Sequence, residues 1–222
     1  MQRCWISGLA GLLVAAGLSA APAASALVPS TTTSLLLSTA ESAYGQTVTA
    51  TATVAAKPGP AEGDVVFSVD DRQFKANLAA SGSATIVLPT ALVGRHPITA
   101  SFVPQFPDSQ EGSSATQVWT VVPVRSRLQV RVIGKGARLP TSVQVKAAGE
   151  YGTRPTGRVK VVVRRTGTRD STRVVTRLSS TAVALAELGK LRKGRYRLEV
   201  TYVGDSQHLR EVHVERFYVR RR

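Results

Sequence analysis

Apolar and polar residues alternate along most of this chain, which is the pattern of β-strands that bury one face and expose the other. Between Thr47 and Val54 every second residue is apolar and the residues between them are threonines. Similar short segments continue almost to the C-terminus, separated by turn-forming residues at intervals of about 8 to 12 residues. Only residues 182–190 are compatible with a helix, and Gly189 and Gly194 would keep it short. The pattern predicts an all-β protein.

The alternating positions form two series of predicted strands. In the first half of the chain they are Val48, Ala50, Ala52 and Val54; Val65, Phe67 and Val69; Ile86 and Leu88; Ile98, Ala100 and Phe102; and Val118, Thr120 and Val122. In the second half they are Leu128, Val130 and Val132; Val143 and Val145; Val159, Val161 and Val163; Leu198, Val200 and Tyr202; and Val212, Val214 and Arg216. A sheet with one apolar face must cover it with another sheet, so these strands indicate β-sandwiches.

An internal repeat supports a division into two units. Residues 94–102 align with residues 194–202 at an offset of 100, and residues 62–67 align with residues 156–161 at an offset of 94. In the longer match both copies begin with glycine and arginine, place a ring at the third position and then alternate apolar residues. We therefore expect one module used twice, as domains at residues 31–123 and 124–220.

Three segments resemble a family of bacterial Ig-like domain repeats found in secreted and cell-surface proteins. They are a Tyr-Gly-Gln strand at residues 44–54, a Gly-x-Val-x-Phe strand at residues 63–67, and a Gly-x-aromatic strand at residues 194–202 followed by Gly204-Asp205. The first unit departs from the last feature, with Pro104-Gln105 in its place. The resemblance covers nearly all of residues 31–220. It implies two tandem immunoglobulin-like β-sandwich domains that serve as a spacer or adhesion module.

The first residues predict export. Arg3 is followed by an apolar run over residues 8–18 and by Ala24-Ser25-Ala26, so we expect a signal peptide at residues 1–26. The apolar run is shorter than the roughly 20 residues that span a bilayer, which argues against a membrane anchor. Cys4 leaves with the signal, so the mature chain has no cysteine. The mature protein is expected to be secreted, without a transmembrane segment, and either released or held noncovalently at the cell wall.

Charge is divided unevenly between the two predicted domains. Residues 27–123 carry four Lys and Arg against seven Asp and Glu, a net charge of −3, whereas residues 124–222 carry 24 against seven, a net charge of +17. Arginine greatly outnumbers lysine, and part of this basicity can reflect compositional bias. The asymmetry supports a domain boundary near Pro123. If either domain binds anionic partners, we expect it to be the second one.

The sequence offers little for catalysis, and we expect no enzyme, cofactor or metal. The mature chain lacks a cysteine for nucleophilic or thiolate chemistry, and no Gly-x-Ser-x-Gly segment occurs. His96 aligns with Tyr196 and is expected to pack as a ring rather than to act as a base. His208 is expected in a loop and His213 on a solvent-facing position, which makes them a poor zinc pair.

Two acidic pairs and one tryptophan have alternative interpretations. Asp70 with Asp71, and Asp108 with Glu111, are too few ligands for calcium, so solvated turns are favoured over a metal site. Trp119 lies between Val118 and Thr120 on the last strand of the first unit. It is expected to point outward, either as a platform for a sugar ring or because it lies near the domain junction.

Basic residues alternate with apolar ones in the second domain. Arg125, Arg127 and Arg131 would share one strand face, while Arg158, Lys160, Arg164, Arg195 and Arg197 would face outward from neighbouring strands. Either these five residues form a solvated face, or they bind an anionic polymer such as teichoic acid, acidic polysaccharide or extracellular DNA. The first choice of function is a non-enzymatic adhesion, structural or binding module at the bacterial cell surface, and the alternative is a polyanion-binding envelope protein. The partner is unknown, and cell-wall polyanions and another surface protein both fit.

Overall fold

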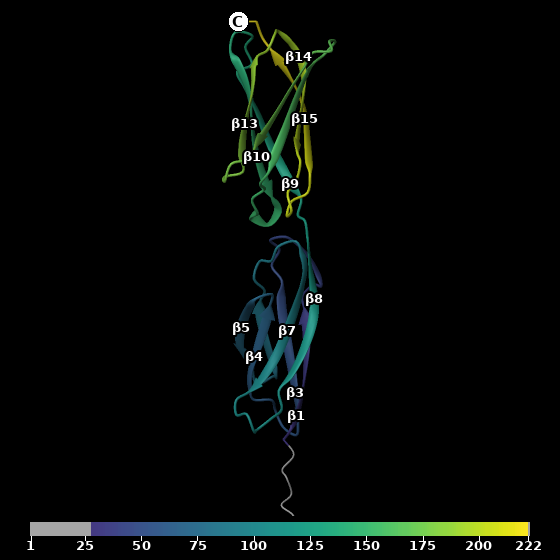
Figure 1. Cartoon of the computed structure of the whole chain (residues 1–222), viewed down its shortest axis with the longest axis vertical. Helices are drawn as coiled ribbons and strands as arrows, with labels where there is room; N and C mark the ends of the chain where they lie inside the picture. The colour runs from purple at the N-terminus through teal and green to yellow at the C-terminus, as the bar shows by residue number, and fades with distance from the viewer. Residues whose placement is uncertain (1–27, 222) are drawn as a thin grey trace, which may run out of the picture.

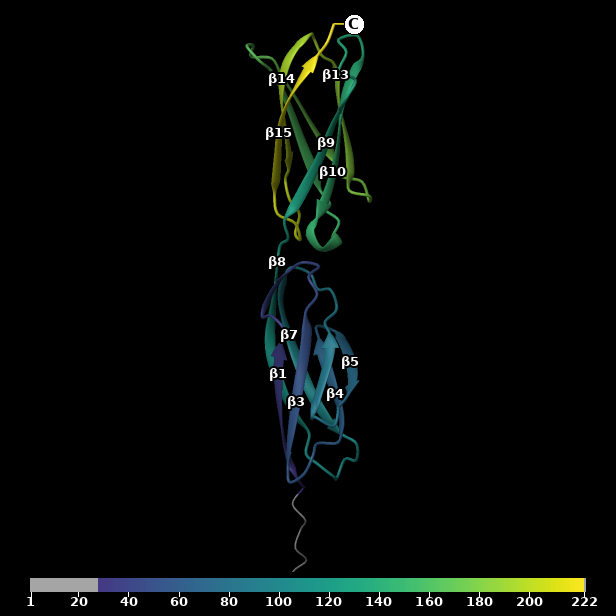
Figure 2. The same ribbon diagram turned by 180° about the vertical axis from the view of Figure 1, so that it is seen from behind.

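The computed structural model describes residues 28–221, in which the regular secondary structure is almost entirely β-strand. Two β-sandwiches follow one another along the chain and lie end to end (Figures 1 and 2). Besides strands, the described residues contain one short 3-10 turn, η1 (Glu150–Gly152). Within residues 28–221 there is no helix long and apolar enough to cross a membrane. The predicted fold class of two tandem sandwiches is confirmed, while the predicted signal peptide at residues 1–26 lies outside the described residues.

The first sandwich packs a three-stranded sheet against a five-stranded sheet. The smaller sheet contains, in spatial order, β1 (Ser30–Leu37), β3 (Thr49–Lys57) and β6 (Ser83–Val87). The larger sheet contains β2 (Glu41–Ala43), β8 (Ser113–Val122), β7 (Gly94–Pro104), β4 (Gly63–Val69) and β5 (Arg72–Asn77). Every pair is antiparallel except β2 with β8, which is parallel.

The second sandwich packs a three-stranded sheet against a four-stranded sheet. The smaller sheet contains β13 (Val183–Lys190), β10 (Pro140–Gly149) and β9 (Ser126–Ile133). The larger sheet contains β12 (Ser171–Arg177), β11 (Arg158–Arg165), β14 (Gly194–Tyr202) and β15 (Glu211–Val219). All pairs in both sheets are antiparallel. The outer face of the four-stranded sheet carries five of the basic residues singled out in the sequence: Arg158, Lys160, Arg164, Arg195 and Arg197.

Each sandwich has its own apolar core, built mainly from alternate residues of its central strands. In the first sandwich these include Val65, Phe67, Val69, Ile98 and Ala100, and in the second they include Val159, Val161, Val163, Leu198 and Val200. The repeated segments form the equivalent strands β7 and β14, which carry Phe102 and Tyr202 with side chains 3% and 0% exposed. The limits of the two domains, 31–123 and 124–220, remain predictions, with β8 ending at Val122 and β9 beginning at Ser126.

The last strand of each sandwich faces the opposite way from its sequence prediction. Its outer row contains Val118 in β8, and Val212 and Val214 in β15, all at least 40% exposed. The buried row contains Trp119 and Val121 in β8, and Phe217 and Val219 in β15. The prediction failed because valine favours strands whether or not its face is covered, so exposed valines produced an apolar alternation in the wrong phase.

The stretch at residues 182–190, which alone was compatible with a helix, forms strand β13 instead. Ala184, Ala186 and Leu188 are buried at alternate positions, which is the period of a strand. Ala184 and Ala186 pair with Val145 and Val143 of β10. Tertiary pairing with an apolar strand therefore overrides the helical preference of the alanines.

Candidate functional site

The five basic residues predicted as a polyanion site all lie on the outer face of the four-stranded sheet, but they do not form one cluster. Arg158, Lys160 and Arg164 project from β11, and Arg195 and Arg197 project from β14. Arg164 and Arg197 are direct cross-strand partners, and Arg195 follows on the same face. Arg158 and Lys160 lie at the other end of β11, where Lys160 is half-buried and Arg158 pairs with Arg177 of β12. The structure therefore brings together only Arg164, Arg195 and Arg197.

Arg216 of β15 completes a transverse row that sequence reasoning missed. Arg197 pairs with Arg164 on one side and with Arg216 on the other, so that three arginines lie side by side across three strands. All three are exposed. We define Arg164, Arg197 and Arg216 as the arginine row. Arg216 was assigned to the alternating apolar series of its strand, and only the cross-strand register shows that it joins the row.

No arginine of the row forms an ion pair among residues 28–221, although Glu199 lies two residues from Arg197 on the same face of β14. Among residues 28–221 Lys75 forms an ion pair with Asp64, three histidine rings lie against carboxylates, and no arginine takes part in an ion pair. Like charges placed directly opposite each other in a sheet destabilise it. The fold thus tolerates a local electrostatic cost at the arginine row, which an anion bound there would relieve.

The charge of the second unit gathers at its distal end, by which we mean loops 134–139, 166–170 and 191–193 together with residues 220–221. These residues contain Lys135, Arg138, Arg169, Arg192, Lys193, Arg220 and Arg221 against the single acid Asp170. The loops at the opposite end, residues 150–157, 178–182 and 203–210, carry two cations and two acids. The arginine row lies toward the distal end of the sheet, near the C-terminus marked in Figure 1.

Arg125, Arg127 and Arg131 do not extend this surface. Arg127 and Arg131 lie on β9, in the three-stranded sheet, where they pair with Ala148 and Gln144 of β10. Arg125 precedes the same strand and is exposed. They form a separate basic strip on the other sheet and provide matched positions for charge-reversal controls.

The histidines are occupied by structural contacts. The Nε2 atom of His96 donates to the carbonyl oxygen of Leu92 at 2.8 Å, and its Nδ1 atom lies 2.9 Å from a carboxylate oxygen of Asp70. Its ring also lies 5.7 Å from that of Trp119. His96 is therefore a packing ring, as predicted, and Asp70 is its partner rather than a metal ligand. The turn signal at Asp70 and Asp71 did not indicate that Asp70 pairs with His96.

Asp205 and His208 form a buried polar cluster in the loop between β14 and β15. The carboxylate of Asp205 accepts hydrogen bonds from the N–H and hydroxyl groups of Thr156, the N–H groups of Gln207 and His208, and the His208 ring, all within 2.9 Å. Burial raises the pKa of this carboxyl, but these hydrogen bonds outweigh burial and hold the pKa well below its usual value. The same carboxylate adds to the effect of burial in raising the pKa of Tyr202.

His208 is in a loop, as predicted, but it is almost completely buried. Its Nε2 atom lies 3.1 Å from the hydroxyl oxygen of Thr153, and that hydroxyl donates to the carbonyl oxygen of Glu150 at 2.8 Å. The Nδ1 atom faces the Asp205 carboxylate. Contacts at both ring nitrogens therefore fix the orientation of the buried ring.

The same loop contacts the first unit. The side-chain oxygen of Gln207 accepts a hydrogen bond from the N–H of Val93 at 2.7 Å. The backbone of the loop pairs with the linker through Val124, which donates to Gln207 and accepts from Leu209. The ring of Tyr44 meets the ring of His208 edge-on at 5.7 Å. A side-chain hydrogen bond and an aromatic contact therefore join the two sandwiches at this loop, and backbone hydrogen bonds tie the linker to it.

Trp119 and His213 do not occupy the positions predicted for them. Trp119 is 2% exposed, and its indole N–H donates to the Ser42 hydroxyl at 2.9 Å, so it is neither a sugar platform nor outward-facing. His213 lies opposite the exposed valines, with its ring 3.6 Å from Glu215 at the partly buried edge of the sandwich. Both errors follow from the reversed facing of the last strands.

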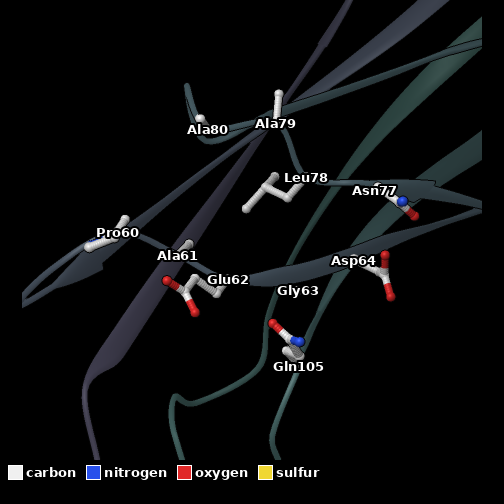
Figure 3. Close-up of a pocket in the computed structure, with 10 residues that line it drawn as sticks. All are labelled: Pro60, Ala61, Glu62, Gly63, Asp64, Asn77, Leu78, Ala79, Ala80 and Gln105. Atoms are coloured by element: carbon white, nitrogen blue, oxygen red, sulfur yellow. The ribbon is translucent and has the colours of Figure 1, made fainter.

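A hollow in the first unit, of about 590 Å³, holds two carboxylates at the end away from the junction (Figure 3). Glu62 and Asp64 lie on either side of Gly63 in this view, and Asp64 is paired with Lys75 at 2.6 Å. Asp108 and Glu111 lie in the loop between β7 and β8. Within residues 28–221 there is no group of three His, Cys, Asp or Glu side chains placed to hold a metal. The hollow does not form an evident reaction centre.

Several solved structures resemble the chain. A tetra-tandem repeat from the extending region of a large adhesion protein is 15% identical, with 86% of this chain and 49% of that chain covered and a TM-score of 0.49. The adhesin InvE of Yersinia pseudotuberculosis is 14% identical, with 83% and 58% covered and a TM-score of 0.39. Two fibronectin type-III domains of chicken tenascin are 11% identical, with 85% and 99% covered and a TM-score of 0.45. The chain thus spans about half the length of the first two of these structures, the tetra-tandem repeat and InvE.

A comparison of sequence profiles identifies the first unit. The profile of the bacterial Ig-like domain (group 3) matches residues 35–122, which include the Tyr-Gly-Gln and Gly-x-Val-x-Phe segments. No curated protein matches the chain. Over residues 35–122 the chain thus resembles the bacterial Ig-like domain (group 3), and the resemblance predicted from these segments is confirmed.

Proposed function

We propose that this chain is exported and acts at the bacterial cell surface as a non-enzymatic adhesion or structural module. The observation that carries the proposal is the junction between the sandwiches, where Gln207 and His208 contact Val93 and Tyr44. A loose tether would leave the two sandwiches free to rotate. Here the contacts between the second sandwich and the first oppose rotation about the linker. A stiff pair of domains suits a spacer that holds one of its ends away from the cell surface.

The test of this proposal is the location and the N-terminus of the protein in its own host. We expect the mature chain to begin at Leu27 and to be recovered from the medium or the wall fraction. The measurement is N-terminal sequencing of the chain recovered from each cell fraction. A full-length chain beginning at Met1 and confined to the cytoplasmic fraction would contradict the proposal.

A second candidate function is the binding of polyanions through the second unit. The observation that favours it is the arginine row, in which three exposed guanidinium groups adjoin without an acidic partner among residues 28–221. Guanidinium groups bind phosphate and carboxylate through paired hydrogen bonds. Of the five residues first predicted, Arg164 and Arg197 belong to the arginine row, Arg195 lies beside it on the same face, and Arg158 and Lys160 supply more distant charge.

Titration of the full mature chain with inorganic polyphosphate at low and at physiological salt tests this function. We expect affinity to fall steeply with salt because binding releases counterions. Reversal of Arg164 and Arg197 to Glu should weaken binding and flatten the salt dependence, whereas reversal of Arg127 and Arg131 provides the same charge change on the other sheet. Equal losses in both double variants would indicate net charge alone and would refute a site at the arginine row.

A further inference from the structure

We infer that a groove on both sides of Tyr218, at the distal end of the second unit, binds an acidic polysaccharide. This inference rests on the polyanion function proposed above and narrows it to one site and one class of polymer. The groove joins two adjoining hollows of about 720 and 590 Å³, which share Arg216, Phe217 and Tyr218. The larger hollow extends over β14 and β11, and the smaller one extends to the loop at residues 134–139.

Tyr218 stands between arginines on the outer face of β15. Its side chain is 42% exposed, and its cross-strand partner is Arg195 of β14. Arg216 lies two residues before it on the same strand and face, and Arg220, just beyond the end of β15, lines the smaller hollow together with Arg216 and Tyr218. The exposed ring therefore shares its hollows with Arg195, Arg216 and Arg220.

The floor beneath Tyr218 is fixed. Phe217 and Tyr196 are buried and stacked, with their ring centroids 5.4 Å apart and their planes at 16°. The hydroxyl of Tyr196 donates to the carbonyl oxygen of Arg192 at 2.7 Å. These contacts hold β14 and β15 together beneath the groove, so the exposed ring is presented on a rigid base.

One wall of the larger hollow is also fixed by an arginine. The guanidinium of Arg165 donates to the carbonyl oxygen of Lys193 at 2.8 Å. It lies against Gly194, where a β-carbon would come within 2.9 Å of its Nε atom. Arg165 is therefore held in place, while Arg164, Arg197 and Arg216 have no ion pair among residues 28–221 and are available to a ligand.

This combination matches the chemistry of a sugar acid. The C–H face of a pyranose packs on an aromatic ring, while its carboxylates accept paired hydrogen bonds from guanidinium groups. A single-stranded nucleic acid is instead held by successive aromatic platforms along a basic channel. Among the described residues that line this groove, Tyr218 is the one exposed ring, because Tyr196 and Phe217 are buried. The observations favour an acidic polysaccharide over a nucleic acid.

The test is a titration of the full mature chain with three probes of matched charge: an oligomer of galacturonic acid, inorganic polyphosphate and single-stranded DNA. We expect Tyr218→Ala to weaken binding of the galacturonate oligomer about tenfold, the loss typical of one stacking contact, and to leave binding of polyphosphate unchanged. Tyr218→Phe should restore binding because the ring face is sufficient. Tyr151→Ala, at the other exposed tyrosine of the second unit, is the matched control and should change nothing.

The outcomes separate this inference from the function on which it rests. If Arg197→Gln and Arg216→Gln weaken all three probes while Tyr218→Ala weakens none, polyanion binding stands and the polysaccharide groove is wrong. If Tyr218→Ala weakens DNA as much as the galacturonate oligomer, the site is not selective for sugars and the inference is also wrong. If the unmodified chain binds no probe at low salt, both proposals fail.

Discussion

The rings of His96 and Tyr196 hold equivalent places in the two sandwiches, and each binds the carbonyl oxygen four residues earlier. His96 donates to Leu92 at 2.8 Å and Tyr196 donates to Arg192 at 2.7 Å. Each ring also packs against the buried aromatic of the next strand, at Trp119 and Phe217 respectively. The two modules thus close the same end of the strand pair in the same way, although an imidazole replaces a phenol.

Removing the Tyr196 hydroxyl isolates the contribution of this hydrogen bond. We expect Tyr196→Phe to lower the free energy of unfolding by about 1 kcal/mol, since the ring remains packed and one hydrogen bond is lost. Tyr218→Phe is the matched control, because its hydroxyl has no bonded partner among residues 28–221 and should be near neutral. Urea denaturation of the three chains gives the comparison, and equal stability of all three would contradict the role assigned to the bond.

Phe102 and Tyr202 test the cores at equivalent strand positions. Because their side chains are 3% and 0% exposed, replacement of either by Ala should cost about 3 to 5 kcal/mol through lost burial and the cavity left behind. Leu36→Ala, at an exposed position of β1, is the control and should cost far less. Thermal unfolding followed by circular dichroism measures the difference, and near-neutral core variants would overturn the assignment of the buried face.

Stability should fall in acid through Asp205. Its pKa in the folded chain lies below the unfolded value of about 3.9, so the ionised carboxylate stabilises the fold above that pH. The contribution is lost as the pH falls from about 5 through the folded pKa. In Asp205→Asn this dependence should be absent, so the unfolding free energies of the two chains should converge on acidification. Parallel curves between pH 7 and pH 3 would show that the hydrogen bonds at Asp205 do not stabilise its charged form.

Gln207 should control the stiffness of the junction. Gln207→Ala removes the acceptor for the N–H of Val93, and we expect wider motion between the sandwiches without unfolding of either. Val203→Ala, at an exposed side chain of the same loop, is the control. Small-angle X-ray scattering should show a broader distribution of end-to-end distances for the Gln207 variant alone. Identical profiles for all three chains would mean that the linker itself sets the geometry.

The sequence predicted the buried face of a strand correctly where the alternating apolar residues are the ones that the fold buries. Val65, Phe67 and Val69 are buried as predicted, and Asp64 and Ser68 mark the other face of their strand. Alternation misled in β15, where Val212 and Val214 are exposed and Phe217 is the buried residue. The candidate site was found in part, since Arg164 and Arg197 are adjacent. Arg216 was missed because strand pairing, which no local pattern encodes, brings it into the row.

Release of the protein from isolated cell walls by increasing salt tests most directly whether this chain is a surface module held through its second unit. We expect retention at low salt and release as salt rises, because charge contacts weaken with ionic strength. A chain with Arg197 and Arg216 reversed to Glu should be released at lower salt than one with Arg127 and Arg131 reversed. Retention that is independent of salt, or release that is identical for the two variants, would contradict the account.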